Sequence, residues 1–231
     1  SDGQGSQMRI SVKDSRTDWI VPNTGYNTQS FSISALSKRN KYIEAALKLT
    51  YYRKDSENLP ISGYNDSSPL KPLIWQPVSA SVGELYEEWH SGRIVDYNSG
   101  ANDDVKLING AMDNPYFVAY EHLNTMDRDR VYGNMSVTGH IIPEQLSLTL
   151  RAGVDFSNDF RTQQKPQYTT AYLNGMYREQ TIRSVEFNTD FLLSWKRTFG
   201  DFYVNASFGG NAMMNNHSNI TMLAQQLKIP N

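Results

Sequence analysis

The stretch SLTLRAGVDF, residues 147–156, alternates between polar and apolar side chains almost without error. Successive side chains of an extended chain point to opposite faces, so one face carries Leu148, Leu150, Ala152, Val154 and Phe156. The other face carries Arg151 and Asp155 among small residues, and this period-two pattern predicts a β-strand. In a soluble sandwich the apolar face meets a protein core, whereas in an outer-membrane barrel it meets lipid and the polar face lines a lumen.

The same alternation recurs along the chain and predicts seven strands in all. In these segments no apolar-face position carries a charge, whereas almost every polar face carries one or more. Segments of about 12–15 residues are longer than most strands of globular sheets and long enough to cross a membrane at a tilt. The predicted strands lie near residues 7–18, 26–37, 42–55, 130–141, 145–157, 183–197 and 202–214.

The connections between these segments fall into two groups. If the strands run up and down in order, all short turns lie at one end of the sheet and all longer connections at the other. Outer-membrane barrels share this division, with short periplasmic turns and long extracellular loops, although a soluble up-and-down barrel can show it too. The short turns are 38–41, 142–144 and 198–201, and the longer connections are 20–25 and the two long loops 56–129 and 158–181.

Aromatic residues lie toward both ends of the predicted apolar faces. Trp195 and Phe202 flank a short turn, and the loop-end positions are held by Phe31, Tyr51, Phe156 and Phe187. This distribution is typical of the two interfacial girdles of a membrane barrel. The alternative is that these rings belong to the core of a sandwich.

The composition of the 231-residue chain excludes several classes of protein. A net charge of −2 gives no reason to expect a nucleic-acid partner. Cysteine is absent, which excludes disulfides, and no apolar run is long enough for a transmembrane helix. The four histidines lack ligand spacing and no nucleophile triad or nucleotide motif is present, so we expect no enzyme and no cofactor. Because the chain opens on SDGQGSQMRISV without a starting Met, we expect an internal segment of a longer protein.

Three stretches together resemble one protein family. DRDRVYGNMSVTGHIIPEQLSLTLRAGVDF (127–156), WIVPNTGYNTQSFSISALSK (19–38) and GYNDSSPLKPLIWQP (63–77) are similar, in this chain order, to segments of the SusC/RagA family of TonB-dependent outer-membrane transporters. The family's Asn-Pro-aromatic segment and its NTxDRxR motif are matched by Asn114-Pro115-Tyr116, Asn124-Thr125, Asp127-Arg128 and Arg130. The sequence departs from the family pattern at His140, where an aromatic residue is usual, and at Phe156, where Tyr is common.

The resemblance implies an all-β fold, namely an antiparallel up-and-down transmembrane β-barrel segment with long extracellular loops. The chain would supply about seven strands of a roughly 22-stranded barrel with a plugged lumen. Its plug domain and TonB-contacting segment would lie outside this chain. The implied function is import of oligosaccharides or peptides across the bacterial outer membrane, driven through TonB and assisted by a SusD-like surface lipoprotein.

The long loop 56–129 holds most of the candidate contacts to substrate or partner. Aromatic faces and amide side chains are the usual means of holding sugars and peptides, although such rings also pack a loop against a barrel rim or a lipoprotein. Within the loop, residues 81–89 are predicted to form a short helix, with Ser81 as N-cap and Glu84 three positions later. The candidate residues are Tyr64, Trp75, Trp89, Tyr97, Asn114, Tyr116 and Tyr120.

The segment DYNSGANDD, residues 96–104, is a weak calcium candidate because it offers oxygens at Asp96, Asn98, Asn102 and Asp104. It lacks the glycine at the sixth position and the glutamate at the twelfth that an EF-hand loop uses. A solvated loop is therefore the favoured interpretation.

Charges of both signs share the predicted polar face. Mixed signs favour an ion-pair network that stiffens a lumen wall over a path that contacts substrate. The residues predicted for this wall are Arg9, Lys48, Arg130, Arg151, Asp155, Glu186 and Asp190.

Two other functions are compatible with the pattern of strands. One is a soluble β-sandwich that serves as a carbohydrate-binding module. The other is a passive outer-membrane porin or receptor without TonB coupling.

Overall fold

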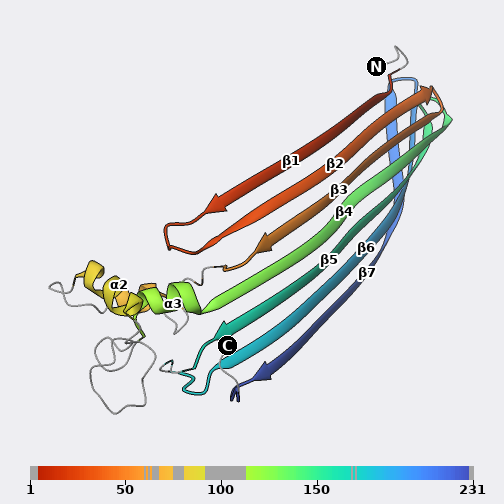
Figure 1. The fold of residues 1–231 in the computed structure, drawn as a ribbon. Helices are drawn as coiled ribbons and strands as arrows, with labels where there is room; N and C mark the ends of the chain where they lie inside the picture. Colours follow the sequence, from red (N-terminus) through yellow and green to blue (C-terminus); the bar gives the residue numbers. More distant parts are fainter. Residues whose placement is uncertain are drawn as a thin grey trace.

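A computed structural model describes residues 5–59, 61, 63, 68–74, 81–91, 113–167, 169 and 171–228. These residues form one antiparallel sheet whose seven strands lie side by side in chain order (Figure 1). Within the described residues β1 and β7 do not pair with each other, so the sheet is open. The strands are β1 (Gln7–Asp18), β2 (Gly25–Asn40), β3 (Ile43–Ser56), β4 (Leu123–Ile142), β5 (Leu146–Lys165), β6 (Met176–Phe199) and β7 (Phe202–Ala224).

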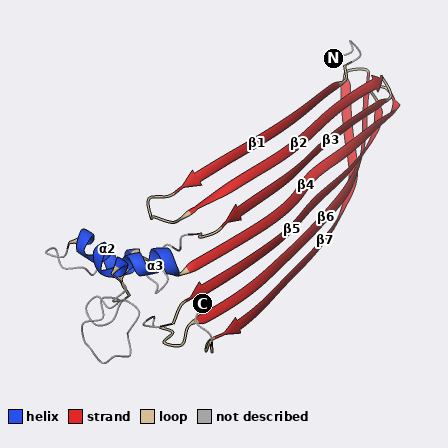
Figure 2. Ribbon diagram, viewed as in Figure 1, coloured by secondary structure: helices blue, strands red, loops and turns tan. Residues whose placement is uncertain are grey.

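Three short helices lie together at one end of the sheet, where Figure 2 shows them beside the ends of the central strands. They are α1 (Leu70–Ile74), α2 (Val82–His90) and α3 (Pro115–Glu121). Among the described residues, no helix has the length and apolar character needed to span a membrane. All three helices belong to the connection between β3 and β4 and lie beyond the ends of these strands.

The register joins the apolar faces of all seven strands into one surface. Residues paired across neighbouring antiparallel strands lie on the same face, so a row can be followed across the sheet. One such row consists of Ile10, Ile33, Leu49, Gly133, Val154, Phe187 and Met214. The predicted strand faces are thus confirmed, and Leu148 to Phe156 occupy the middle of a single apolar sheet face.

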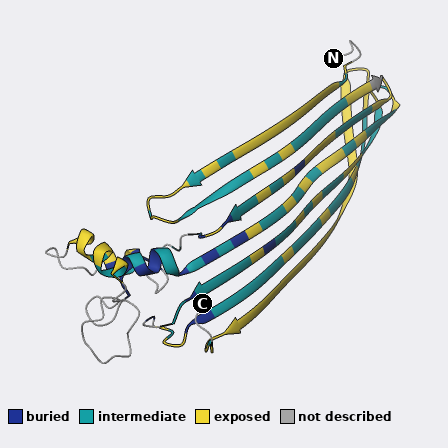
Figure 3. Cartoon of the chain, viewed as in Figure 1, coloured by how far each residue is buried: buried dark blue, intermediate teal, exposed yellow. Residues whose placement is uncertain are grey.

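No other described layer covers this apolar face. Val12 is 75% exposed and Leu150 is 52% exposed, which is the reverse of a soluble core. The buried apolar residues of the described chain lie at the end of the sheet that carries the helices, around α3 and the adjoining strand ends. Figure 3 draws buried residues there in dark blue. A β-sandwich buries its apolar face against a second sheet, so the described architecture does not support that alternative.

The apolar face has a defined height. On β5 it extends over ten residue steps, from Leu146 to Phe156. At about 3.3 Å per residue and a tilt of about 40°, this corresponds to a band of about 25 Å, the height of the lipid-facing band of outer-membrane barrels. Two residues beyond it the same face becomes polar, since the next row contains Arg53, Asp129 and Arg183.

Five strands are longer than the alternation predicts, among them β2, which spans Gly25–Asn40 instead of 26–37, and the predicted loop 158–181 is wrong. β5 and β6 remain paired from Leu146↔Trp195 to Lys165↔Met176, so only residues 166–175 connect them. The signal disappears because polar residues occupy most positions of both strand faces beyond the apolar band, with only scattered apolar residues such as Phe160 and Ile220. Ladder hydrogen bonds, in contrast, need only the backbone. For the same reason β4 begins at Leu123 instead of 130, β5 ends at Lys165 instead of 157, β6 begins at Met176 instead of 183, and β7 ends at Ala224 instead of 214.

The predicted division of the connections is confirmed. Residues 41–42, 143–145 and 200–201 form the tight turns at one end, where Figure 1 also places the N-terminal strand end. Gly200 has a φ of 58°, a left-handed conformation that glycine adopts without steric cost and that two-residue hairpins need. The longer connections 19–24, 57–122 and 166–175 all lie at the opposite end. We call these the turn end and the loop end.

Candidate functional site

Capping interactions fix the two longer helices at the loop end. Ser81 is the N-cap of α2, and its hydroxyl accepts a hydrogen bond from the Glu84 amide at 3.4 Å. Asn114 is the N-cap of α3, where the Asn114 Oδ1 accepts from the Tyr116 amide at 2.9 Å, and Pro115 occupies the first helical position. Both caps satisfy backbone N–H groups that have no partner inside a helix. The helix predicted from Ser81 is confirmed.

Aromatic rings from α2 and α3 form one cluster, which we call the aromatic cluster. The Trp89 and Tyr120 rings stack with centroids 4.7 Å apart, and the Tyr86 and Tyr116 rings meet edge to face at 5.2 Å. The Trp89 indole also donates a hydrogen bond to Glu121 Oε1 at 2.8 Å. Three of the predicted contact residues, Trp89, Tyr116 and Tyr120, therefore lie together and remain only half-buried. Their intermediate exposure leaves part of each side chain accessible from outside the cluster.

Asn114 does not belong to this open surface. Its side chain is fully buried, and its Nδ2 donates to the Leu85 carbonyl of α2 at 3.0 Å while its Oδ1 caps α3. The prediction of Asn114 as a direct contact is therefore wrong in this arrangement. The residue holds the two helices together because its short amide reaches both backbones at once.

Replacing Asn114 by alanine should loosen the helices, because both the cap and the link to Leu85 disappear. We expect amide hydrogen exchange in 82–90 and 115–121 to become several-fold faster, since a lost cap costs about 1 kcal/mol. Asn114→Asp is the comparison variant, because its carboxylate can still cap α3 but cannot donate to Leu85 and adds a charge at a buried position. If both variants exchange like the wild type, Asn114 does not hold the helices.

Asn58 anchors the helices to the sheet, a role that the sequence did not reveal. This residue is 5% exposed, and its Nδ2 donates to the carbonyls of Asn23 and Ala119, each at 3.0 Å. Its Oδ1 accepts from the Asn124 amide at 3.1 Å. One amide side chain thereby joins the β1–β2 connection, α3 and the start of β4. A single asparagine in a polar loop carries no sequence signal for such a role.

Trp19 and Tyr26 form a second aromatic feature at the loop end. Their rings meet edge to face with centroids 5.7 Å apart and line a hollow of about 480 Å³ beside the β1–β2 connection. Lys54 Nζ lies 4.0 Å from the Tyr26 ring centroid, within the range of a cation–π interaction. Neither residue was predicted as a contact from the sequence, where their only signal is a tryptophan directly before a turn.

Several predicted sites lie outside the described residues. These are the contact candidates Tyr64, Trp75 and Tyr97 and the calcium candidates Asp96, Asn98, Asn102 and Asp104. Among the residues that the structure describes, no group of three or more histidine, cysteine, aspartate or glutamate side chains has a geometry suited to a metal ion.

The polar face of the sheet carries the predicted ion pairs. Arg130 Nε donates to Asp155 Oδ1 at 2.8 Å, and Arg151 Nε donates to Asp190 Oδ1 at 2.6 Å. Four of the seven predicted wall charges are thus paired, which supports a stiffening role for them. Arg9, Lys48 and Glu186 form no ion pair with any described residue.

The ion-pair network continues toward the loop end, into residues that were predicted to lie in the loops 56–129 and 158–181. Asp159 is nearly buried and accepts from Arg128 Nε at 3.1 Å and from Arg161 Nη2 at 2.6 Å. A carboxylate held between two guanidinium groups keeps both arginines against the wall. The sequence did not reveal the strand at this position because its other face, apart from Phe160, is also polar.

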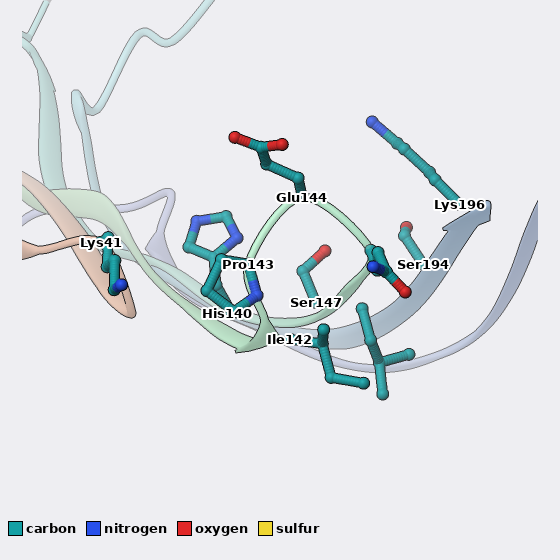
Figure 4. A pocket seen from close by; sticks show the side chains of 10 residues that line it. Lys41, His140, Ile142, Pro143, Glu144, Ser147, Ser194 and Lys196 are labelled. Atoms are coloured by element: carbon teal, nitrogen blue, oxygen red, sulfur yellow. The ribbon is translucent and has the colours of Figure 1, made fainter. Parts of the chain in front are cut away.

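A hollow of about 380 Å³ lies at the turn end, beside the β4–β5 turn (Figure 4). Ser147 and Ser194 line its floor, and Figure 4 shows Glu144 and Lys196 on either side, with Ile142 across the ribbon from them. Lys41 approaches from the neighbouring turn, whose Tyr42 carbonyl accepts from the His140 amide at 2.7 Å. The hollow offers cationic and hydroxyl groups near the turn end of the polar face.

Comparison with solved structures finds chains of the same fold. The structure titled "Structure of the RagAB peptide transporter" shares 15% identity with a TM-score of 0.62, over 96% of this chain and 24% of that chain. Structures of the RagAB peptide importer in the "closed-closed" and "open-open" states share 15% identity with TM-scores of 0.57 and 0.58, each over 95% of this chain and 27% of that chain. No protein-family model and no curated protein matches the sequence.

This likeness establishes the fold. The chain spans about a quarter of the length of the matched chains, and nearly all of it aligns with them. The open seven-stranded sheet is therefore a segment of a larger β-barrel, which explains why both of its edges and its apolar face are left uncovered.

Proposed function

We propose that this chain is part of a TonB-dependent outer-membrane importer of oligosaccharides or peptides that works with a SusD-like surface lipoprotein. The observation that carries the proposal is the uncovered apolar face of the sheet, about 25 Å high in a tilted barrel, opposite a polar face with paired charges. Lipid suits the first face and a water-filled or plugged lumen suits the second. The likeness to peptide transporter structures supports the same assignment.

The two ends of the sheet also suit this orientation. Short turns face the periplasm in outer-membrane barrels, and long loops face the outside. The aromatic cluster and the Trp19–Tyr26 pair both lie at the loop end, where an incoming substrate or a surface partner arrives. Half-exposed rings there can stack on sugars or peptides.

An apolar groove at the loop end supports the lipoprotein partner. It has a volume of about 240 Å³ and is lined mainly by apolar side chains of the β1–β2 connection and all three helices, among them Ile20, Leu70, Leu73 and Val82. Ile20 and Val82 are strongly exposed in this chain. Exposed apolar patches on protein surfaces commonly mark interaction sites.

Uptake by cells that carry the full-length protein tests the proposal. We expect labelled peptides or oligosaccharides too large for general porins to enter these cells, and entry to stop when an uncoupler collapses the proton-motive force. Cells without the protein are the control. Uptake that persists with the uncoupler would identify a passive porin instead.

Expression of the 231-residue segment alone distinguishes the membrane barrel from a soluble module. We expect it to be insoluble without detergent, because the apolar face and two unpaired sheet edges are exposed. A water-soluble monomer of this segment would contradict the assignment of the apolar face to lipid.

A further inference from the structure

A second hollow lies on the polar face, in the middle of the sheet and away from both ends. Its volume is about 270 Å³. Since a water molecule takes about 30 Å³ in the liquid, this space equals that of several water molecules and is large enough for one peptide side chain. The residues around it come from three neighbouring strands and carry aromatic, amide and carboxylate groups. They are Tyr132, Asn134, Gly153, Asp155, Glu186 and Asn188.

Gly153 keeps the floor of this hollow open, and the strand itself gives no reason for a glycine there. A Cβ at Gly153 would find its nearest foreign atom, the Gly133 carbonyl oxygen, at 3.7 Å, which is ordinary contact. Its φ is not in the left-handed region. Glycine weakens a strand interior and often marks the close approach of a ligand or another chain segment. The glycine leaves the space above the floor of the hollow unfilled.

The charge of the hollow is unbalanced. Asp155 and Glu186 are direct partners in the β5–β6 register, and like charges opposite each other destabilise a sheet. Arg130 compensates Asp155 through two hydrogen bonds, whereas Glu186 forms no ion pair with a described residue. The next pair toward the turn end, Arg151 and Asp190, is already matched. One carboxylate, that of Glu186, thus faces the hollow without a cation from the described residues.

We propose that this hollow binds a single guanidinium or ammonium group, with Glu186 as its anionic acceptor. Asn134 offers a neutral amide oxygen beside it, whereas the Asn188 Oδ1 already accepts a hydrogen bond from Asn211 Nδ2 at 2.5 Å. Hydrogen bonds between a cation and a carboxylate are stronger than those between neutral groups. The inference rests on the proposed function, because the polar face must line a lumen. The cation is a lysine or arginine side chain, carried either by an imported peptide or by a segment of the full-length protein inside the barrel.

The test uses the purified full-length protein and two fluorescent pentapeptides, one with a central arginine and one with citrulline, its neutral isostere, at the same position. Glu186→Gln removes the charge and keeps the shape, and Gly153→Leu fills the hollow and keeps the charge. Glu44→Gln is the control, since Glu44 lies on the same face outside the hollow and pairs with Lys38 at 3.3 Å. Folding of each variant is checked by its heat-dependent electrophoretic mobility.

If the cation belongs to an imported peptide, both hollow variants weaken binding of the arginine peptide by about ten-fold or more and leave the citrulline peptide unchanged. If it belongs to the protein itself, peptide binding is unchanged, and hydrogen exchange of one interior segment becomes faster in both variants but not in Glu44→Gln. The proposal is overturned if both hollow variants bind the arginine peptide as tightly as the wild type does and also show the same hydrogen exchange as the wild type. Failure of the proposed function gives a different result, because cells that carry the wild-type protein would then show no energy-dependent uptake.

Discussion

Replacing Leu150 by arginine should destabilise the full-length protein in lipid by about 2–4 kcal/mol. Leu150 is 52% exposed on the apolar face and lies near the middle of the band between Leu146 and Phe156. An arginine there faces the centre of the hydrocarbon layer, where its charge loses hydration and finds no partner. Equilibrium unfolding of the protein in vesicles with increasing denaturant measures the loss.

Arg151→Leu is the control, because Arg151 is the next residue of β5 and faces the opposite way. It removes the bond to Asp190, whose side chain is 24% exposed, while the Arg151 side chain is 56% exposed. Ion pairs this accessible contribute about 0–1 kcal/mol, so the loss should be smaller than for Leu150→Arg. The reverse ranking would place lipid on the polar face and contradict the proposed orientation of the barrel wall.

Replacing Gly133 by alanine should cost about 1–3 kcal/mol, although it adds only one methyl group. The new Cβ would lie 2.2 Å from the Lys48 carbonyl oxygen and 2.9 Å from the Leu49 Cα. Both atoms belong to the backbone of β3, so the clash cannot be relieved by a side-chain rotation. The β3–β4 ladder must shift instead, and the same unfolding experiment in vesicles measures the loss.

Gly153→Ala provides the matched comparison on the neighbouring strand. Its Cβ would have no foreign atom closer than 3.7 Å, so we expect stability within about 0.5 kcal/mol of the wild type. Equal losses in the two variants would show that the close approach of β3 does not determine the effect. The two variants thus distinguish Gly133, where the β3 backbone leaves no room for a Cβ, from Gly153, where a Cβ fits.

Only some of the contact residues predicted from the sequence lie together on the surface of the structure. Trp89, Tyr116 and Tyr120 were predicted because aromatic residues suit sugars and peptides, and the structure brings them into one cluster. Asn114 was predicted on the same grounds but lies inside, between two helix backbones. A residue type indicates the chemistry that a side chain can perform. Whether the side chain faces outward depends on how α2 packs on α3, which no local pattern encodes.

The polar wall shows the same limit. The alternation placed Arg151 and Asp190 on one face, yet they are 39 positions apart in the chain. They meet because the β5–β6 register makes them direct partners, whereas Arg130 reaches diagonally to Asp155, which pairs with Tyr132. Glu186 remains without an ion pair in the described chain for the same reason, since its partner in that register is another carboxylate.

The sequence by itself determined which side chains share a face, which connections are short and that the apolar face alternates with a polar one. These are local properties, because successive side chains of an extended strand must point to opposite faces. Only the tertiary structure decided where the strands end, which charges pair and where the hollow around Gly153 opens. Those features depend on the hydrogen-bond register between strands distant in the chain, and the backbone ladder continues where the side-chain alternation has already stopped.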